Sequence, residues 1–370
     1  MGFPVQVSKR SPAIVSVFVL SMTSNIDTAH RYLSRMERGW LLWAMCAAAG
    51  FLPLLCALPE RWLFRFWKGL SIASVVLVVL VWWKIPVETV RVDRWELMSN
   101  FLHRLFQGEY PYLASSHLNP APPAPFPWLF LVGIPAWWVG EIGWFPLASL
   151  VLLVWIAPKR VRPFLVIALA TSLPVWYEVI VRSNIVANAA LVGAFLLTEP
   201  GRKSSGVVLN AILAGVVLCT RACFAAPVLV WAGSVFVARR EWKRLAIWGG
   251  AALFVALLPF ALLIWVWGWP LFREWNPLRI QGAIQSPIGP ILVLVASPWI
   301  GSMARSAIDR LWIGYLVVLL PMLALLLPVL VDGSWLLSNR GYFEVAFWNT
   351  SLVLGMLAWS VARAEREDKN

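Results

Sequence analysis

Apolar runs dominate this chain, and most of them are long enough to cross, or nearly cross, a lipid bilayer. A helix of about 20 apolar residues spans the ~30 Å hydrocarbon core, and shorter runs can cross as tilted or discontinuous helices. The sequence therefore predicts an all-α, polytopic membrane protein with about 11 transmembrane helices. The predicted spans are residues 40–58, 69–87, 144–157, 163–181, 184–197, 206–220, 222–238, 245–267, 289–303, 311–331 and 342–361.

Composition agrees with lipid as the main solvent of the side chains. Apolar residues make up 60% of the 370 positions and charged residues only 13%, with a mean hydropathy of +0.75. A water-soluble domain needs a more highly charged surface. We expect one multispanning domain over residues 39–370. The N-terminal segment, residues 1–38, stays open between a marginal first helix at 12–22, a signal-like segment and sequence upstream of a start at Met36.

The net charge of +13 arises from short blocks of Lys and Arg between the apolar runs. Such blocks are typical of topology signals and not of a nucleic-acid interface, so no nucleic-acid partner is expected. The strongest block, at 239–244, predicts a cytoplasmic loop, and five further blocks then fall on the same side. This assignment requires residues 127–157 to cross once, with 127–140 as a re-entrant or interfacial helix. It predicts a bacterial-type cytoplasmic (inner) membrane protein whose loops 88–125 and 269–287 are extracytoplasmic.

The four cysteines lie inside apolar runs and show neither metal-binding nor disulfide spacing. We interpret them as buried small hydrophobic residues. A metal cage is not expected in the first outer loop, and no cofactor is implied. The cysteines are Cys46, Cys56, Cys219 and Cys223.

The loop at 88–125 contains a predicted amphipathic helix that ends at Gly108. Its two faces differ with the period of an α-helix, which predicts an interfacial helix on the membrane with a polar face toward water or a cavity. The apolar face carries Met98, Phe101, Leu102 and Leu105, and the polar face carries Glu96, Asn100, His103 and Gln107.

An acidic residue after an early span, then the amphipathic helix, the segment LFQGEYPY at 105–112 and a proline cluster resemble the GT-C glycosyltransferases. The resemblance is greatest to the branch of polyprenol-phosphate-mannose-dependent mannosyltransferases. Further on, Arg182-Ser183-Asn184 stands where that branch often has a Gly-Gln-x-Asn turn, and Arg221 stands where it has a basic residue between two spans. The likeness extends over roughly residues 87–244, although the Gly-Gln pair is absent.

The resemblance implies a hexosyltransferase that moves a sugar, such as mannose, from a polyprenyl-phosphate donor to an extracytoplasmic glycan or glycolipid acceptor. An acceptor hydroxyl needs a general base, and the departing phosphate needs cations beside it. Arginine suits the second task because its planar fork pairs with phosphate oxygens. The expected catalytic residues are Asp93 and Glu96, and the expected substrate-binding residues are His103, Arg182, Asn184, Arg221 and Arg279.

Other interpretations remain open at this point. Asp93 and Glu96 could simply solvate an outer loop or pair with neighbouring arginines, and His103 could be an ordinary surface histidine. A transporter or flippase of a lipid-linked substrate is an alternative, although the chain has no convincing internal repeat. A polysaccharide polymerase or ligase would share the lipid-linked substrate. A membrane scaffold would leave Arg182 and Arg221 unexplained, because ionisable residues flanked by apolar runs are costly.

Overall fold

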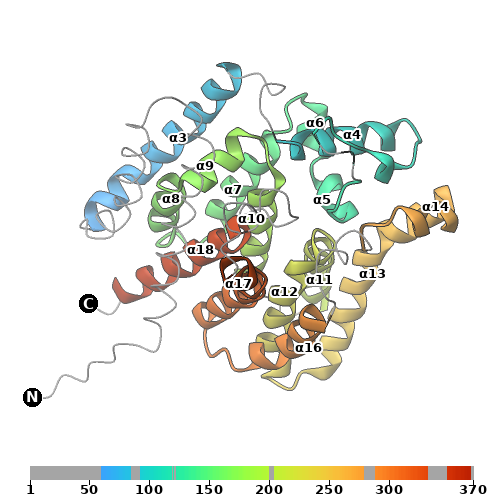
Figure 1. Ribbon diagram of the computed structural model, residues 1–370. Coiled ribbons are helices and arrows are strands. Elements are labelled where there is room, and N and C mark those ends of the chain that lie inside the picture. Colours follow the sequence, from blue (N-terminus) through green and yellow to red (C-terminus); the bar gives the residue numbers. More distant parts are fainter. Residues whose placement is uncertain are drawn as a thin grey trace, which may run out of the picture.

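A computed structural model describes residues 60–84, 92–118, 120, 122–199, 204–278, 288–331 and 348–367. Within these residues the chain is helical and contains no β-strand, which confirms the all-α prediction (Figure 1). The N-terminal segment 1–38 and the predicted span 40–58 lie outside the described residues.

Two described helices, α3 (Glu60–Lys84) and α13 (Trp242–Trp267), are long and apolar enough to cross a membrane. Helices α8 (Arg162–Ala170) and α9 (Leu173–Ile180) would form a third span if counted together, although they are bent by 74°. These helices indicate membrane association. The predicted number of about 11 spans is not confirmed, because most other apolar helices are shorter than a bilayer is thick.

The remaining helices of the bundle surround α10 (Asn184–Leu196), which is buried along almost its whole length (Figure 1). Small residues of α10 allow its neighbours to approach closely, as is typical of helix pairs in membranes. At Gly193, a β-carbon would lie 3.2 Å from side chains of both Leu153 and Leu357. The surrounding helices are α7 (Trp144–Ile156), α11 (Ser204–Leu218), α12 (Ala225–Ala232), α17 (Ala307–Val331) and α18 (Trp348–Glu367).

A closer crossing joins the end of α12 to α16 (Ile288–Ser302). Gly233 begins the π-helical turn η4 (Gly233–Val237), and a β-carbon there would lie 2.0 Å from the Pro298 carbonyl oxygen. A β-carbon on Gly301 would lie 2.2 Å from the Val230 carbonyl oxygen. The two backbones therefore touch where each helix has a glycine, and no larger residue fits at either position.

A smaller layer lies at one end of the bundle (Figure 1). Its short helices α5 and α6 meet at Gly133 and are six and five residues long, so neither can cross a bilayer by itself. A re-entrant or interfacial position of 127–140 in a membrane stays a prediction. The layer consists of α4 (Arg94–Phe106), η2 (Pro111–Leu113), α5 (Pro127–Val132), α6 (Ile134–Trp138) and α14 (Trp269–Glu274).

Helix α4 is the amphipathic helix that the sequence predicts, and Met98, Phe101 and Leu102 are buried as expected. They are covered by protein: the Phe101 ring stacks on Phe130 at a centroid distance of 3.9 Å and meets the edge of Tyr112 at 5.2 Å. The apolar face of α4 thus packs against α5 and η2 and does not rest on lipid. Packing against protein gives α4 a fixed orientation that a helix floating on a membrane would lack.

Replacing Phe101 by Ala should destabilise the protein by about 3–5 kcal/mol, because it removes a fully buried ring and leaves a cavity. Phe106→Ala is the matched control on the same helix. Phe106 is 51% exposed, and losing its stack on Trp137 should cost at most about 1 kcal/mol. Unfolding of the two variants in mixed micelles gives the comparison. Equal losses would mean that α4 is not anchored through Phe101.

Candidate functional site

The turn between α9 and α10 holds the centre of the candidate site. Arg182 adopts a left-handed backbone with φ of 57°, a conformation that costs a non-glycine residue about 1 kcal/mol or more. Ser183 caps α10, because its hydroxyl accepts a hydrogen bond from the Ile185 amide. The Ser183 amide donates back to the Glu178 carbonyl at 2.8 Å. These hydrogen bonds fix the end of α9 and the start of α10, so the side chains of the turn between them have fixed directions.

Glu178 lies in the last turn of α9 and is fully buried. A guanidinium nitrogen of Arg94, the first residue of α4, lies 3.5 Å from its carboxylate and 3.5 Å from the Ser183 hydroxyl. A buried carboxylate without a cation beside it would be very costly, so this pair joins the start of α4 to the α9–α10 turn.

Arg221 reaches the same place from the segment between α11 and η3 (Ala222–Phe224). It is 8% exposed, and its guanidinium donates to the Asn184 side-chain oxygen at 3.1 Å. Burial lowers the pKa of Arg221 to about 10, and Cys223 raises it. Smaller effects come from Arg94, which lowers the pKa, and from Glu178 and Asp93, which raise it. Arg221 therefore remains a cation at neutral pH, within electrostatic reach of these three groups.

Asp93 precedes α4 and is partly buried. It stands at the N-cap position, yet its carboxylate accepts no capping hydrogen bond from the helix. An N-cap aspartate normally uses its side chain in this way. The Asp93 carboxylate does not cap the first turn of α4, and its negative charge acts on Arg221.

The rival acid, Glu96, is engaged in the loop that follows α4. Its carboxylate accepts the His117 amide at 3.2 Å and forms a short contact with the His117 ring. One turn further along, the Asn100 amide donates to the Ser115 carbonyl at 2.8 Å. The polar face of α4 therefore holds the 114–118 segment, and His103 on the same face is exposed.

Arg182 points to the other side of the turn and forms a two-contact pair with Glu141, both distances being 3.3 Å. Its guanidinium also donates to the Ile180 carbonyl and lies 5.7 Å from the centre of the Trp82 ring. This pair ties α9 to the linker before α7. Phosphate binding by Arg182 stays a prediction, and Arg279 lies outside the described residues.

The structure thus brings Arg221 into contact with Asn184 and places Asp93 beside Arg94, which contacts the same turn, with Arg182 on the far side of that turn. Glu96 and His103 lie along α4 on its polar face. Sequence reasoning missed Glu178, and it considered Arg94 only as a partner for the loop acids. The signal for Glu178 was present, since it is an acidic residue inside the predicted span 163–181.

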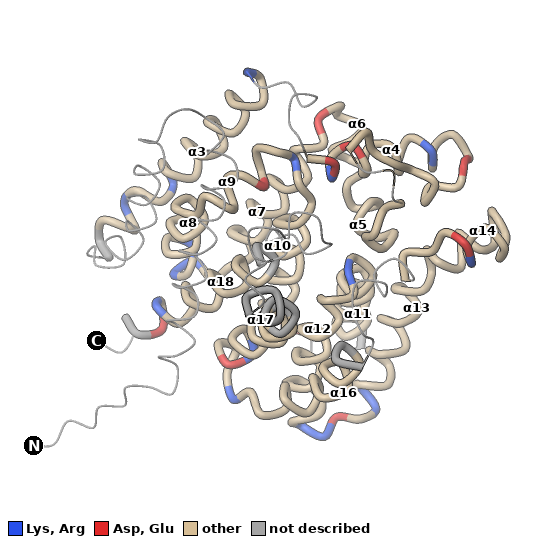
Figure 2. Tube along the Cα trace, in the orientation of Figure 1, with Lys and Arg blue, Asp and Glu red and all other residues tan. Residues whose placement is uncertain are grey.

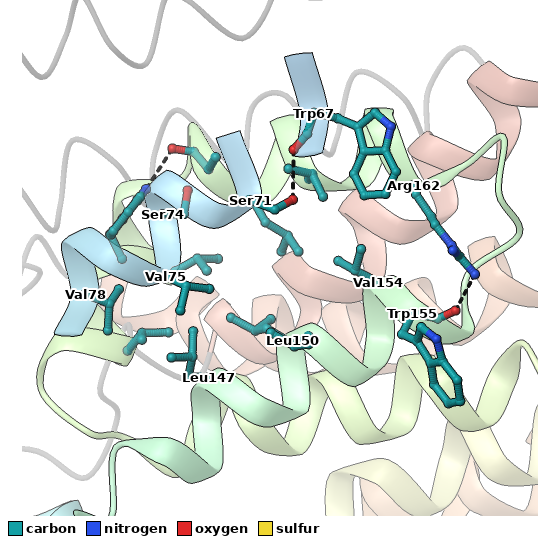
Figure 3. A pocket seen from close by; sticks show the side chains of 17 residues that line it. Trp67, Ser71, Ser74, Val75, Val78, Leu147, Leu150, Val154, Trp155 and Arg162 are labelled. Atoms are coloured by element: carbon teal, nitrogen blue, oxygen red, sulfur yellow. Dashed lines mark hydrogen bonds between the residues drawn. The ribbon is translucent and has the colours of Figure 1, made fainter. Parts of the chain in front are cut away.

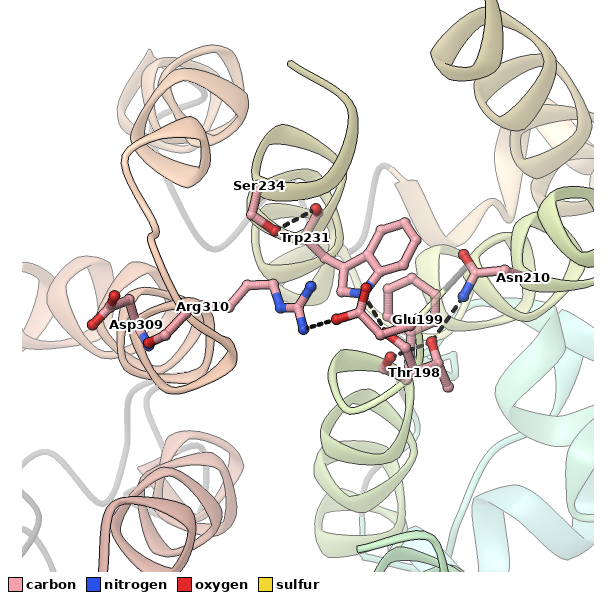
Figure 4. Close-up of polar contacts among 9 residues, drawn as sticks. Thr198, Glu199, Asn210, Trp231, Ser234, Asp309 and Arg310 are labelled. Carbon is pink, nitrogen blue, oxygen red and sulfur yellow. Dashed lines mark hydrogen bonds and ion pairs between the residues drawn. The ribbon is translucent and has the colours of Figure 1, made fainter. Parts of the chain in front are cut away.

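A second polar network lies away from the candidate site. At the opposite end of α10, Thr198 accepts hydrogen bonds from Asn210 and Trp231, and Glu199 pairs with Arg310 (Figure 4). This network connects α10 to α11, α12 and α17, which satisfies polar groups in the bundle. Among the described residues, no group of three or more His, Cys, Asp or Glu side chains is placed to hold a metal ion.

No family model, no curated protein and no solved structure matches this chain.

The Arg182–Glu141 pair should stabilise the fold measurably. In a double-mutant cycle with Arg182→Gln and Glu141→Gln, we expect a coupling of about 2 kcal/mol, because Arg182 is only 2% exposed and the hydrogen bonds are charge-assisted. The exposed pair Arg104–Glu109 is the control, with an expected coupling below about 1 kcal/mol. Unfolding measurements in mixed micelles test both cycles. Equal couplings would mean that the Arg182 pair does not hold the turn.

Proposed function

We propose that the protein is a membrane-embedded glycosyltransferase of the GT-C type. It moves a hexose, such as mannose, from a polyprenyl-phosphate donor to an extracytoplasmic glycan or glycolipid. The observation that carries the proposal lies at one end of an apolar helical bundle. Arg94, directly after the partly buried Asp93, lies 3.5 Å from Ser183, and the buried cation Arg221 donates to Asn184 at 3.1 Å. These contacts join three distant parts of the chain: the start of α4, the α9–α10 turn and the segment after α11.

In the proposed mechanism Asp93 is the general base. Its carboxylate takes the proton of the acceptor hydroxyl while that oxygen attacks the anomeric carbon of the donor sugar. The bond from this carbon to the phosphate oxygen breaks, and the lipid phosphate leaves with the additional negative charge. Arg221 stabilises this charge, and Asn184 orients its guanidinium through the 3.1 Å hydrogen bond.

Glu178 and Arg94 have a supporting part in this proposal. The pair is nearly neutral as a unit, so it holds the start of α4 without adding strong net charge to the site. Its removal would release Asp93 from its position next to Arg221. A carboxylate displaced by about 1 Å loses much of its value as a base, since positioning contributes strongly to rate.

We propose further that the protein has about 11 membrane spans and that its active site faces the extracytoplasmic side. Figure 2 draws Lys and Arg mainly in the loops and at helix ends, separated by long uncharged stretches. The exposed block at Arg239 and Arg240 would be cytoplasmic under the positive-inside rule. The site residues at the start of α4 would then face the opposite compartment.

A first test compares Asp93→Asn with Glu96→Gln. Asparagine keeps the shape of the side chain but cannot accept the proton, so transfer should fall about a hundredfold or more. Glu96→Gln should keep most of the activity, because Glu96 holds the loop through His117. The measurement is transfer of radiolabel from polyprenyl-phosphate mannose to envelope lipids and glycans in membranes that contain each variant.

Measuring donor binding distinguishes a variant that has lost the general base from a variant that no longer folds. Asp93→Asn should still retain labelled donor, whereas Arg221→Gln should weaken donor retention as well as transfer. An inactive Glu96→Gln beside an active Asp93→Asn would make Glu96 the base. If both acid variants transferred sugar at the full rate, neither Asp93 nor Glu96 would be the base, and the proposal would lose its main support.

A second test concerns sidedness. In a background without the four native cysteines, a cysteine at Glu109, whose side chain is 52% exposed, should react with an impermeant maleimide added to intact cells. A cysteine at Arg239 should react only after the membrane is opened, because positive loops stay in the cytoplasm. Labelling of the Arg239 position in intact cells would reverse the proposed orientation.

A further inference from the structure

An apolar cavity of about 290 Å³ lies between α3, α7 and the bent pair α8–α9, away from the candidate active site (Figure 3). Its size is near the lower end of the range for ligand pockets. The residues of α3 that line it fall on one helical face, from Trp67 through Ser71 and Val75 to Val78. Across the cavity, Leu147, Leu150 and Val154 of α7 form the opposite wall.

The bend between α8 and α9 shapes the third wall. The helices meet at 74°, where Ser172 caps α9 and the Trp176 indole donates to the Ala170 carbonyl at 2.7 Å. Leu169 and Ala170 line the cavity from one side of the bend, and Val175 lines it from the other. Hydrogen bonds thus hold the bend in place, so the cavity is a built feature of the fold.

The cavity opens to the surface along α7. Val151 and Trp155 both line it, and they are also 51% and 69% exposed. In a membrane this opening faces acyl chains. From Trp67 to Val78 α3 rises by about 16 Å, which is close to half of the ~30 Å hydrocarbon core. The cavity therefore has the depth of one leaflet, starting at the end where α3 begins.

Charge is concentrated at that same end. Arg162 lines the cavity beside Trp67 and Trp155, and it donates to the Trp155 and Ala157 carbonyls at the end of α7 (Figure 3). Exposed basic residues adjoin these lining residues in the chain, and Glu60, the first residue of α3, is the one acidic residue in the sequence of 60–84 and 144–170. The basic residues are Arg65 and Lys68 next to Trp67, and Lys159 and Arg160 just before Arg162.

We propose that this cavity binds an acyl chain of an anionic glycerophospholipid, with its phosphate among the basic side chains at the rim. The apolar walls favour an acyl chain, because a chain that fills the cavity makes van der Waals contacts that an empty cavity lacks. The rim selects the anionic headgroup, since each nearby Lys or Arg attracts such lipids. The depth of one leaflet fits an acyl chain, whereas a polyprenyl chain long enough to cross the bilayer would extend beyond it.

This site is separate from the proposed transfer reaction and is tested without it. The full-length protein is reconstituted in vesicles that contain phosphatidylglycerol with a diazirine at the end of one acyl chain. After illumination, labelled peptides are identified by mass spectrometry. We expect label on the cavity walls near Val78 and Leu147, suppressed by excess phosphatidylglycerol and hardly changed by excess phosphatidylcholine.

Neighbouring valines of α3 provide the matched variants. Val75→Trp should fill the cavity and lower labelling about tenfold, whereas Val76→Trp, at a position 51% exposed, should leave it unchanged. At the rim, Lys159→Gln with Arg160→Gln should reduce the preference for phosphatidylglycerol. Arg239→Gln with Lys243→Gln, both exposed around the start of α13, should not.

Three results would overturn the proposal. Equal labelling of the Val75 and Val76 variants would mean that the lipid does not enter the cavity. Equal competition by phosphatidylcholine would mean that the rim does not select charge. Absence of label from both walls would mean that another occupant, such as the chain's own apolar run at 40–58, excludes lipid. None of these results depends on sugar transfer.

Discussion

A carboxylate buried as deeply as that of Glu178 must have a cation beside it, and this requirement organises the candidate site. The cation is Arg94, which belongs to a segment 84 residues earlier in the chain. Because Arg94 begins α4, its pairing with Glu178 holds that end of the helix against the α9–α10 turn. Asp93, the residue just before, then lies within reach of the charge on Arg221. The placement of the proposed base thus follows from neutralising a charge inside an apolar bundle.

The side chains of the α9–α10 turn point to two sides and make different contacts on each. Arg182 faces Glu141 and Trp82 and connects the turn to the linker before α7 and to α3. Ser183 and Asn184 face Arg94 and Arg221. The left-handed backbone at Arg182 allows consecutive side chains to diverge in this way. Arg182 therefore has a clear structural role, and Arg221 is the stronger candidate for contact with a phosphate.

Most polar groups of α10 lie near its two ends. The exception is Asn188, one turn inside the helix, whose buried side chain has no hydrogen-bond partner among the described residues; the rest of the helix is small and apolar. One end carries the Asn184–Arg221 contact, and just beyond the other Thr198 and Glu199 join the network of Asn210, Trp231 and Arg310. This distribution suits a helix that crosses an apolar medium, where polar groups need partners inside the protein. The two ends differ in chemistry. The network at Thr198 consists of structural hydrogen bonds and an ion pair, whereas the site at Asn184 combines two arginines with two carboxylates.

The sequence by itself determined the features that depend on local order: an all-helical chain, an apolar medium, and the apolar face of α4 with Met98, Phe101 and Leu102. It also singled out Asp93 and Asn184 through the resemblance to the GT-C enzymes, and Arg182 and Arg221 additionally because ionisable residues flanked by apolar runs are costly. Only the tertiary structure decided which partners these residues have. The pairs of Glu178 with Arg94 and of Arg182 with Glu141 join positions 84 and 41 residues apart. The engagement of Glu96 by His117 and the 74° bend of α8 against α9 likewise depend on loop and helix packing. Helical period and hydropathy are properties of neighbours in the chain, whereas a buried charge is satisfied by whichever segment the packing brings beside it.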